Sequence, residues 1–524
     1  MDRNEAIDMA SAGAKRRLGL FSLLAVVSPC IGVAQVDFDC VAPSAPPLVA
    51  PTVLGDGSAG SVTRAQLQQA LDAGGAIRVD VGASTLALDA TLRVTRATML
   101  DLGGATLSGG NARRVIEVQN PSSQTYAFVL LHGAIADGST PSASGAGVYK
   151  ATGGPWQAVT LRLFDVRFTN NRAIAAAQDD GGGAIYVVGA AELAIVRSQF
   201  DGNTGSNGGA LYSLGSKTVN LYDSSFNGNL ATGSGGNPGN GGNGGAIGVD
   251  GDARYLNLCR VRLRDNEANA YGGGLYTVTY GDASYTRIQD STIQHNVSSA
   301  SDKLAGGAYI QGSPISISGS MFRDNAANGY AGLALFGYGG SLTGSIVNST
   351  FDGNLARGGL GGAMAIEAAT ALTLQNVTIA RNAAPCAVCF AAGIANDSGA
   401  PLTLRNVLFQ DNVGGNAYNP WAVLHPAANG TANLQWPLQR PAAGQTEVAA
   451  APGTVFANAG VAVPAANGGP TETAALPTGS PAIDAGTAIG APPTDQRGAP
   501  RAGAVDIGAY ERQPDPIFRS GFEP

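Results

Sequence analysis

This sequence of 524 residues has little charge, few aromatic rings and few histidines: 13% of its residues are charged, 6% are aromatic and three are histidine. Its formal net charge is −7 and it has no basic cluster, so it is poorly suited to the phosphates of nucleic acid. The histidines, His132, His295 and His425, lack metal-ligand spacing. We therefore expect no nucleic-acid partner, no metal and no cofactor.

Long apolar runs are also rare, and the one that stands out lies near the N-terminus. LGLFSLLAVV (18–27) follows Lys15, Arg16 and Arg17, and Gly32-Val33-Ala34 places small residues where a signal peptidase cleaves. Cys30 leaves a lipoprotein open as an alternative, although Pro29 fits lipid attachment poorly. We predict a signal peptide over 1–34, a linker over 35–60, and a secreted or outer-surface protein with no transmembrane segment after cleavage.

Glycine is abundant, with 75 residues, and it belongs to a repeat. The pattern F/I/L-x-x-N recurs about every 30 residues, a period typical of solenoids. A catalytic site does not recur nine times in one chain, so we interpret the repeat as a structural unit of the fold. Its nine asparagines are Asn171, Asn203, Asn229, Asn266, Asn296, Asn325, Asn354, Asn382 and Asn412.

Each repeat contains three short extended runs, which LTLRNVLFQDN (402–412) and GGAIYV (182–187) illustrate. Such runs cannot form a free-standing sheet, but coil stacked on coil they form a parallel β-helix. The sequence therefore predicts an all-β protein with a single parallel β-helix over 76–415. Its core should hold an aromatic ladder and an asparagine ladder, whose clearest members are Phe200, Phe226, Phe322, Phe351 and Phe409, and Asn203, Asn229, Asn325, Asn354 and Asn412.

Both ends of such a stack need covering. TRAQLQQALDAGG (63–75) has Thr63 and Gln66 as a capping box and Gly74 as a terminator, which predicts a helical lid over 61–75. Residues 416–512 are rich in Pro, Ala and Gly, and we assign them to an irregular C-terminal cap. Residues 513–524 form a tail.

Two resemblances support this fold. The pair F-x-x-N and G-G-A, as in FDGN/GGAL (200–211), FNGN/GGAI (226–247) and FDGN/GGAM (351–364), resembles the repeats of the polymorphic outer-membrane protein family, surface β-helical passengers associated with adhesion. The stretch 467–511, with TDQRGAPR and VDIGAYE, resembles the end of secreted bacterial β-helix proteins of the choice-of-anchor Q type. These resemblances imply that the β-helix is right-handed and that the protein is exported. They imply no particular reaction.

Candidates for catalysis are weak, and we assign no catalytic residue. Asp179 and Asp180 form the best acidic pair, while Arg264-Asp265 and Arg323-Asp324 recur in two RDN turns. Recurrence at equivalent positions favours turn formation or ion pairing over a single active centre. A polysaccharide lyase or glycoside hydrolase stays open as an alternative.

A binding role has somewhat better support. Tyr186, Tyr212 and Tyr276 alternate with apolar residues, so they could point outward as an aromatic row that stacks sugar rings, or simply shield the sheet. Cys386 and Cys389 suggest a local disulfide or two buried thiols. We predict a monomeric, non-enzymatic, adhesin-like surface protein that binds polysaccharide or cell-surface glycans, with a structural envelope or matrix protein as a second alternative.

Overall fold

The structure is a computed structural model, which describes residues 40–121, 123–150, 157–235, 240–252, 255–280, 284–312, 314–337, 342–367, 369–396, 401–416, 423–437, 449–501 and 503–513. The predicted signal peptide and nearly all of the predicted tail lie outside these residues. The described residues, all from Cys40 onward, belong to one compact unit.

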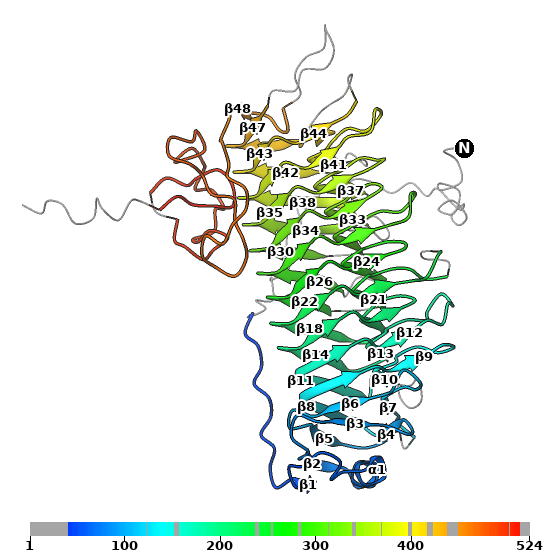
Figure 1. Ribbon diagram of the computed structural model, residues 1–524. Helices are drawn as coiled ribbons and strands as arrows, with labels where there is room; N and C mark the ends of the chain where they lie inside the picture. Colours follow the sequence, from blue (N-terminus) through cyan, green and yellow to red (C-terminus); the bar gives the residue numbers. More distant parts are fainter. Residues whose placement is uncertain are drawn as a thin grey trace, which may run out of the picture. The chain divides into compact units, whose positions relative to one another are not determined.

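This unit is a parallel β-solenoid, and the all-β prediction is confirmed (Figure 1). Its strands form three sheets, and every pair of named strands in them is parallel. Sheet C, the narrowest, has ten strands of two residues. They are β9 (Ser139–Thr140), β12 (Arg172–Ala173), β16 (Thr204–Gly205), β20 (Leu230–Ala231), β24 (Glu267–Ala268), β28 (Val297–Ser298), β32 (Ala326–Ala327), β36 (Leu355–Ala356), β40 (Ala383–Ala384) and β44 (Val413–Gly414).

Sheet B has twelve strands and forms another side of the solenoid. They are β4 (Leu92–Val94), β7 (Ile116–Val118), β10 (Val148–Lys150), β13 (Ile185–Val188), β17 (Leu211–Leu214), β21 (Ile247–Asp252), β25 (Leu275–Tyr280), β29 (Ala308–Gln311), β33 (Leu333–Phe336), β37 (Met364–Glu367), β41 (Ile394–Asn396) and β45 (Val423–Leu424).

Sheet A is the widest, with 26 strands in two runs that meet at a turn. Two long strands, β8 (Tyr126–Ala136) and β11 (Val159–Thr169), belong to both runs. The first run also holds β1 (Thr52–Leu54), β2 (Gly75–Val79), β5 (Thr98–Asp101), β14 (Glu192–Val196), β18 (Thr218–Tyr222), β22 (Tyr255–Cys259), β26 (Tyr285–Gln289), β30 (Ile315–Ser318), β34 (Leu342–Val347), β38 (Ala369–Gln375), β42 (Leu402–Arg405) and β46 (Asn429–Thr431). The second run also holds β3 (Thr85–Ala87), β6 (Thr106–Ser108), β15 (Gln199–Asp201), β19 (Ser225–Asn227), β23 (Arg262–Arg264), β27 (Thr292–Gln294), β31 (Met321–Arg323), β35 (Thr350–Asp352), β39 (Thr378–Ala380), β43 (Leu408–Gln410), β47 (Leu434–Trp436) and β48 (Val455–Phe456).

One coil shows how the sequence dictates these bends. Strand β42 ends at Arg405, and Asn406 turns the chain with φ 52° before β43. Strand β43 ends at Gln410, and Asp411 makes a second left-handed turn with φ 55°. Asparagine and aspartate tolerate this backbone region better than other non-glycine residues, so the repeat spacing of these residue types sets the corners of the solenoid.

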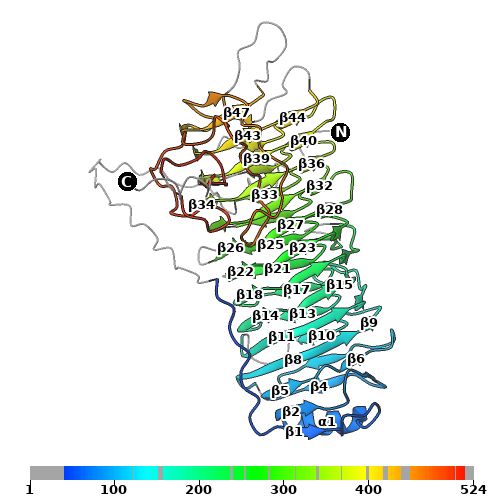
Figure 2. The ribbon, with the colours of Figure 1, turned by 60° about the vertical axis from the view of Figure 1, so that its left-hand side comes forward.

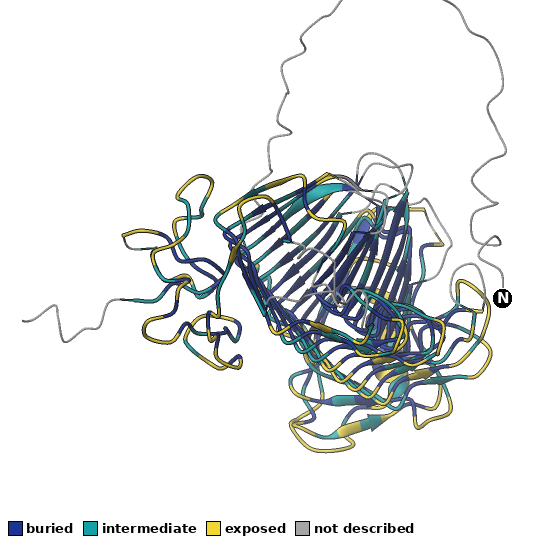
Figure 3. Cartoon of the chain, turned by 90° about the horizontal axis from the view of Figure 1, so that it is seen from above, coloured by how far each residue is buried: buried dark blue, intermediate teal, exposed yellow. Residues whose placement is uncertain are grey.

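The interior is held by stacked rings and stacked amides. Phe200 lies 4.8 Å from Phe168 and 4.3 Å from Phe226 between ring centroids, and Phe322 lies 4.7 Å from Phe351. The nine asparagines of the repeat form one buried ladder, in which each side-chain oxygen from Asn203 onward accepts hydrogen bonds from the asparagine one coil earlier. Figure 3 shows buried strands inside and exposed turns at the rim.

At the N-terminal side the chain forms α1 (Arg64–Ala73), the one helix among the described residues. Thr63 and Gln66 make a capping box at its start, and Leu67 and Leu71 are buried. The helix contacts β1, β2 and β4. Before it, residues 40–51 run along the solenoid (Figures 1 and 2), and a disulfide joins Cys40 to Cys259 of β22.

Beyond residue 415, where the repeat fades in the sequence, the stack continues through β45 to β48. The chain then turns back, and residues 457–501 and 503–513, which we call the flank segment, lie beside sheet A (Figures 1 and 2). Asn348, Asn376 and Asn406, at the turn between the two runs, donate side-chain hydrogen bonds to flank-segment carbonyls at 2.7, 3.2 and 2.9 Å. The flank segment covers a side of the solenoid, so the prediction of a cap that closes the C-terminal end is not confirmed.

Candidate functional site

The three tyrosines of the predicted sugar platform do point away from the core, but they are not exposed. Tyr186, Tyr212 and Tyr276 are only 7%, 2% and 2% exposed, because neighbouring rings and loops cover them. The Tyr186 hydroxyl, for example, donates to the backbone oxygen of Asp179 at 2.9 Å. Burial also raises the pKa of the Tyr212 hydroxyl well above its usual value. The prediction of an outward platform is corrected on this point: a sugar cannot stack on covered rings.

The acidic candidates serve turns and loops. Asp180 accepts hydrogen bonds from the Ser144 hydroxyl at 2.9 Å and from the Ala177 amide at 3.0 Å, so it organises its own loop. Asp265 and Asp324 have left-handed backbones with φ 55° and 51°. His295 lies between them, with ring nitrogens 3.6 Å and 3.3 Å from their carboxylates.

The two cysteines of CAVC, Cys386 and Cys389, form a disulfide in a loop between sheets C and B. Among the described residues, no group of three or more His, Cys, Asp or Glu side chains is placed to hold a metal ion.

A different surface has the chemistry that these positions lack. In the second run of sheet A, the residue just before each core anchor points outward, and parallel register aligns these residues in one row. In the earlier coils the row is polar and open to solvent, with Arg167, Gln199 and Arg262 exposed and Ser225 and Thr292 partly exposed. In the later coils it is buried under the flank segment: Met321, Thr350, Thr378 and Leu408 are 0%, 0%, 2% and 0% exposed.

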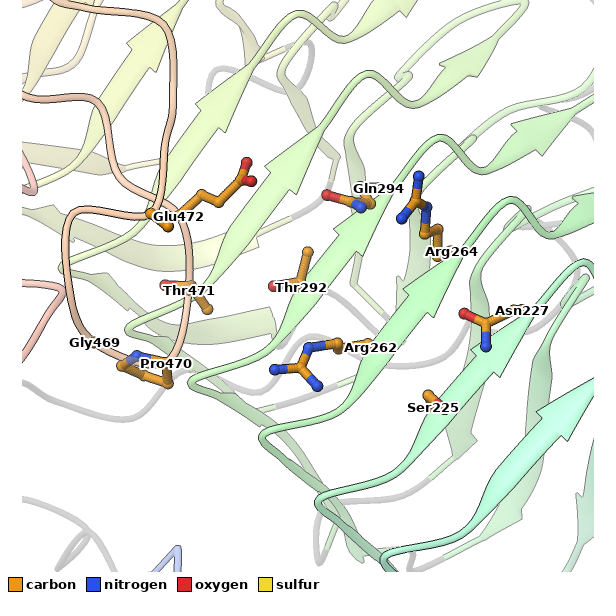
Figure 4. Close-up of a pocket in the computed structure, with 11 residues that line it drawn as sticks. Ser225, Asn227, Arg262, Arg264, Thr292, Gln294, Gly469, Pro470, Thr471 and Glu472 are labelled. Atoms are coloured by element: carbon orange, nitrogen blue, oxygen red, sulfur yellow. The ribbon is translucent and has the colours of Figure 1, made fainter. Parts of the chain in front are cut away.

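A cleft of about 510 Å³ lies where the open part of this row meets the flank segment (Figure 4). Its floor comes from β19, β23 and β27, and its wall comes from residues 466–472. The Arg262 side chain extends towards Gly469 and Pro470 (Figure 4). The floor residues are Ser225, Asn227, Arg262, Arg264, Thr292 and Gln294.

The wall is fixed to the solenoid by buried polar contacts. The Thr471 hydroxyl donates to the backbone oxygen of Gly319 at 2.9 Å. Gln496 donates to the Thr471 hydroxyl at 2.9 Å and accepts from the Thr350 hydroxyl at 2.6 Å. Arg323 pairs with the Glu472 carboxylate. Because Thr471, Gln496 and Thr350 are buried, the wall has a defined position before any ligand binds.

The arginines around the cleft are paired with carboxylates, with one exception. Arg260 pairs with Asp223, and this bond raises the pKa of the Arg260 guanidinium. Arg264 pairs with Asp265 at 3.0 Å. Arg262 is an exposed residue of the floor, and its guanidinium group has no hydrogen bond or ion pair with any of the residues that the structure describes.

A smaller cavity of about 140 Å³ adjoins the cleft, since Arg262, Thr292 and Pro470 line both. Asp290 also lines it, and burial raises the pKa of the Asp290 carboxyl. Gly319 leaves room for this carboxylate: a Cβ atom at position 319 would lie 2.2 Å from Asp290 Oδ1.

Sequence reasoning missed this cleft because its wall comes from residues about 200 positions after its floor. The sequence carries a partial signal, since the position before each anchor is polar from Arg167 to Thr292 and apolar at Met321 and Leu408. Thr350 and Thr378, which are also buried under the flank segment, are polar, so residue type alone does not mark where the row is covered.

Comparison with known proteins finds one match within the repeat. Residues 165–188 match the model of the Chlamydia polymorphic membrane protein (Chlamydia_PMP) repeat. The matched stretch contains the end of β11, Asn171 of the ladder, β12 and β13, so it is the part of one coil that passes from sheet A through sheet C to sheet B. No curated protein matches the chain.

The repeat match and the parallel solenoid together suggest a surface or outer-membrane-associated repeat protein. In the part of the chain that the structure describes, no helix is long and apolar enough to cross a membrane.

Proposed function

We propose that this protein is an exported, adhesin-like surface protein that binds glycans in the cleft between sheet A and residues 466–472. The observation that carries the proposal is the preformed cleft, with its floor of hydroxyl, amide and guanidinium groups. Sugar hydroxyls need such donors and acceptors, and a site fixed before binding loses little entropy when it is occupied.

The solenoid suits a polymeric ligand. Side chains in one row of a parallel sheet recur at every coil, about 4.8 Å apart. Arg167, Gln199 and Ser225 continue the floor row away from the wall, so a glycan in the cleft can follow it. A surface protein with such a row could hold polysaccharide of its own cell or of a neighbouring one.

A glycan-cleaving enzyme is the second candidate, and Asp290 is the observation that favours it. Its raised carboxyl pKa, beside the cleft, is the property that a general acid needs. Glycoside hydrolysis usually takes two carboxyl groups, however, and the neighbouring Asp223 is bound by Arg260 through both oxygens. We therefore favour binding without cleavage.

The test is to incubate the purified protein with acidic and neutral polysaccharides, and to measure both retention and new reducing or unsaturated ends. We expect retention of at least one polysaccharide and no new ends. New ends that disappear in Asp290→Asn would establish the enzyme instead.

Ser225→Trp would locate the site, because an indole on the cleft floor should displace the glycan. Its matched control is Ser299→Trp, at an exposed position after β28 of sheet C. Equal retention by both variants, each with the circular dichroism spectrum of the wild type, would contradict this placement.

A further inference from the structure

We propose that the cleft takes the end of an anionic glycan, with a carboxylate or sulfate group bound by Arg262. This inference rests on the proposed function and adds the class of ligand and its direction of binding.

The first argument is the pairing of charges around the cleft. Arg260, Arg264 and Arg323 each have a carboxylate partner from the protein. Arg262 stands among them without one, although its side chain lines both cavities. A guanidinium group matches the planar geometry of a carboxylate and binds sulfate in a similar way. The protein thus offers one unneutralised cation at the floor of a cleft, in a chain whose net charge is −7.

The groups near Arg262 suit the rest of an acidic sugar. Ser225 and Thr292 lie next to it in the same row, one coil before and one coil after. Asn227 and Gln294 line the cleft beside Arg264 in the parallel row two residues further along each strand. These side chains can exchange hydrogen bonds with ring hydroxyls while Arg262 holds the anion.

The second argument is that the row is open at one end and closed at the other. From Arg167 to Arg262 it is accessible, but from Met321 onward the same register is buried under the flank segment. The closure is firm, because Thr471 is bonded to Gly319 and to Gln496. A glycan that follows the row into the cleft must therefore end at Pro470 and Thr471, whereas an internal stretch of a long chain cannot pass the wall.

The experiment titrates the full protein with a short oligogalacturonate, with its carboxyl-reduced neutral counterpart, and with a sulfated oligosaccharide of similar length. We expect binding of one or both acidic probes and weaker binding of the neutral one. Arg262→Gln should weaken acidic-probe binding by about 10- to 100-fold, the loss expected for one charge-assisted interaction. The control is Arg172→Gln on β12, which removes another exposed arginine and should change nothing.

A long polygalacturonate then tests the direction of binding. If the cleft holds a chain end, the number of protein molecules bound per chain stays constant as the chain lengthens. A number that rises with chain length would overturn the end-on inference. Equal affinity for acidic and neutral probes would overturn the anion inference, while retention of no glycan at all would overturn the proposed function itself.

Discussion

Replacing Asn325 by alanine should destabilise the solenoid more than replacing an exposed asparagine or glutamine by alanine does. Asn325 is 0% exposed and sits in the middle of the asparagine ladder. Its side-chain oxygen accepts from the Asn296 amide at 3.1 Å and from Asn296 Nδ2 at 3.0 Å. Its own Nδ2 donates to the Ile293 carbonyl at 2.9 Å and to Asn354 Oδ1 at 2.9 Å.

The magnitude follows from the groups that Asn325→Ala leaves behind. The Asn296 backbone N–H and one N–H of its side chain lose their acceptor in the interior. Each buried donor without a partner costs about 1–3 kcal/mol, so we expect a loss of about 2–6 kcal/mol in the free energy of unfolding. A water molecule in the space left by the amide would bring the loss to the lower end of that range.

Urea unfolding followed by circular dichroism measures this loss. Gln199→Ala is the control, because it removes an exposed amide from the outer face of sheet A and should change stability by less than about 0.5 kcal/mol. If Asn325→Ala were as stable as Gln199→Ala, the ladder would not hold the coils together and the reasoning would be wrong.

Three further predictions concern stability. Lys150 is 3% exposed, and burial lowers the pKa of its amine from 10.5 to about 8; between these pH values the unfolded chain binds more protons than the folded one, so stability should rise with pH. In unfolding curves recorded from pH 7 to 11, Lys150→Met should be more stable by about 1–3 kcal/mol at pH 7 and should not show this rise. Gly319→Ala should lower the melting temperature more than Gly228→Ala, because both positions have φ 59° but only at 319 does the new Cβ meet a neighbour, Asp290 Oδ1; equal melting temperatures would contradict this. Removing the Cys40–Cys259 disulfide should lower the free energy of unfolding by about 4 kcal/mol more than removing Cys386–Cys389, because the first closes a loop of 219 residues and the second a loop of 3. Similar urea midpoints for the two variants, each with both cysteines replaced by serine, would refute the loop-entropy argument.

The repeat made the fold predictable. The period of about 30 residues, the anchor phenylalanines and the asparagines each have one role in a stacked coil, so nine copies reinforce the same prediction. The capping box at Thr63 and Gln66 is equally local, since three residues of spacing define it. What the sequence could not supply was the position of the flank segment, because its contacts with Asn348, Asn376 and Asn406 join residues more than 80 positions apart.

The same reason explains the site. Alternation placed Tyr186, Tyr212 and Tyr276 on the outer side of sheet B, but alternation says nothing about loops that cover a face. Arg262 drew no attention in the sequence, since one arginine before an anchor looks like any exposed strand residue. Its meaning depends on Pro470 and Thr471, which the fold brings to it from the flank segment.

The most direct test of the central claim is to locate the bound glycan on the protein. Amide hydrogen exchange would be measured with and without a polysaccharide that the protein retains. We expect slower exchange in 225–227, 262–264, 292–294 and 466–472, which form the floor and the wall of the cleft. Exchange should be unchanged in β13 and β17, the strands of Tyr186 and Tyr212. Protection confined to another face, with the cleft unaffected, would contradict the account.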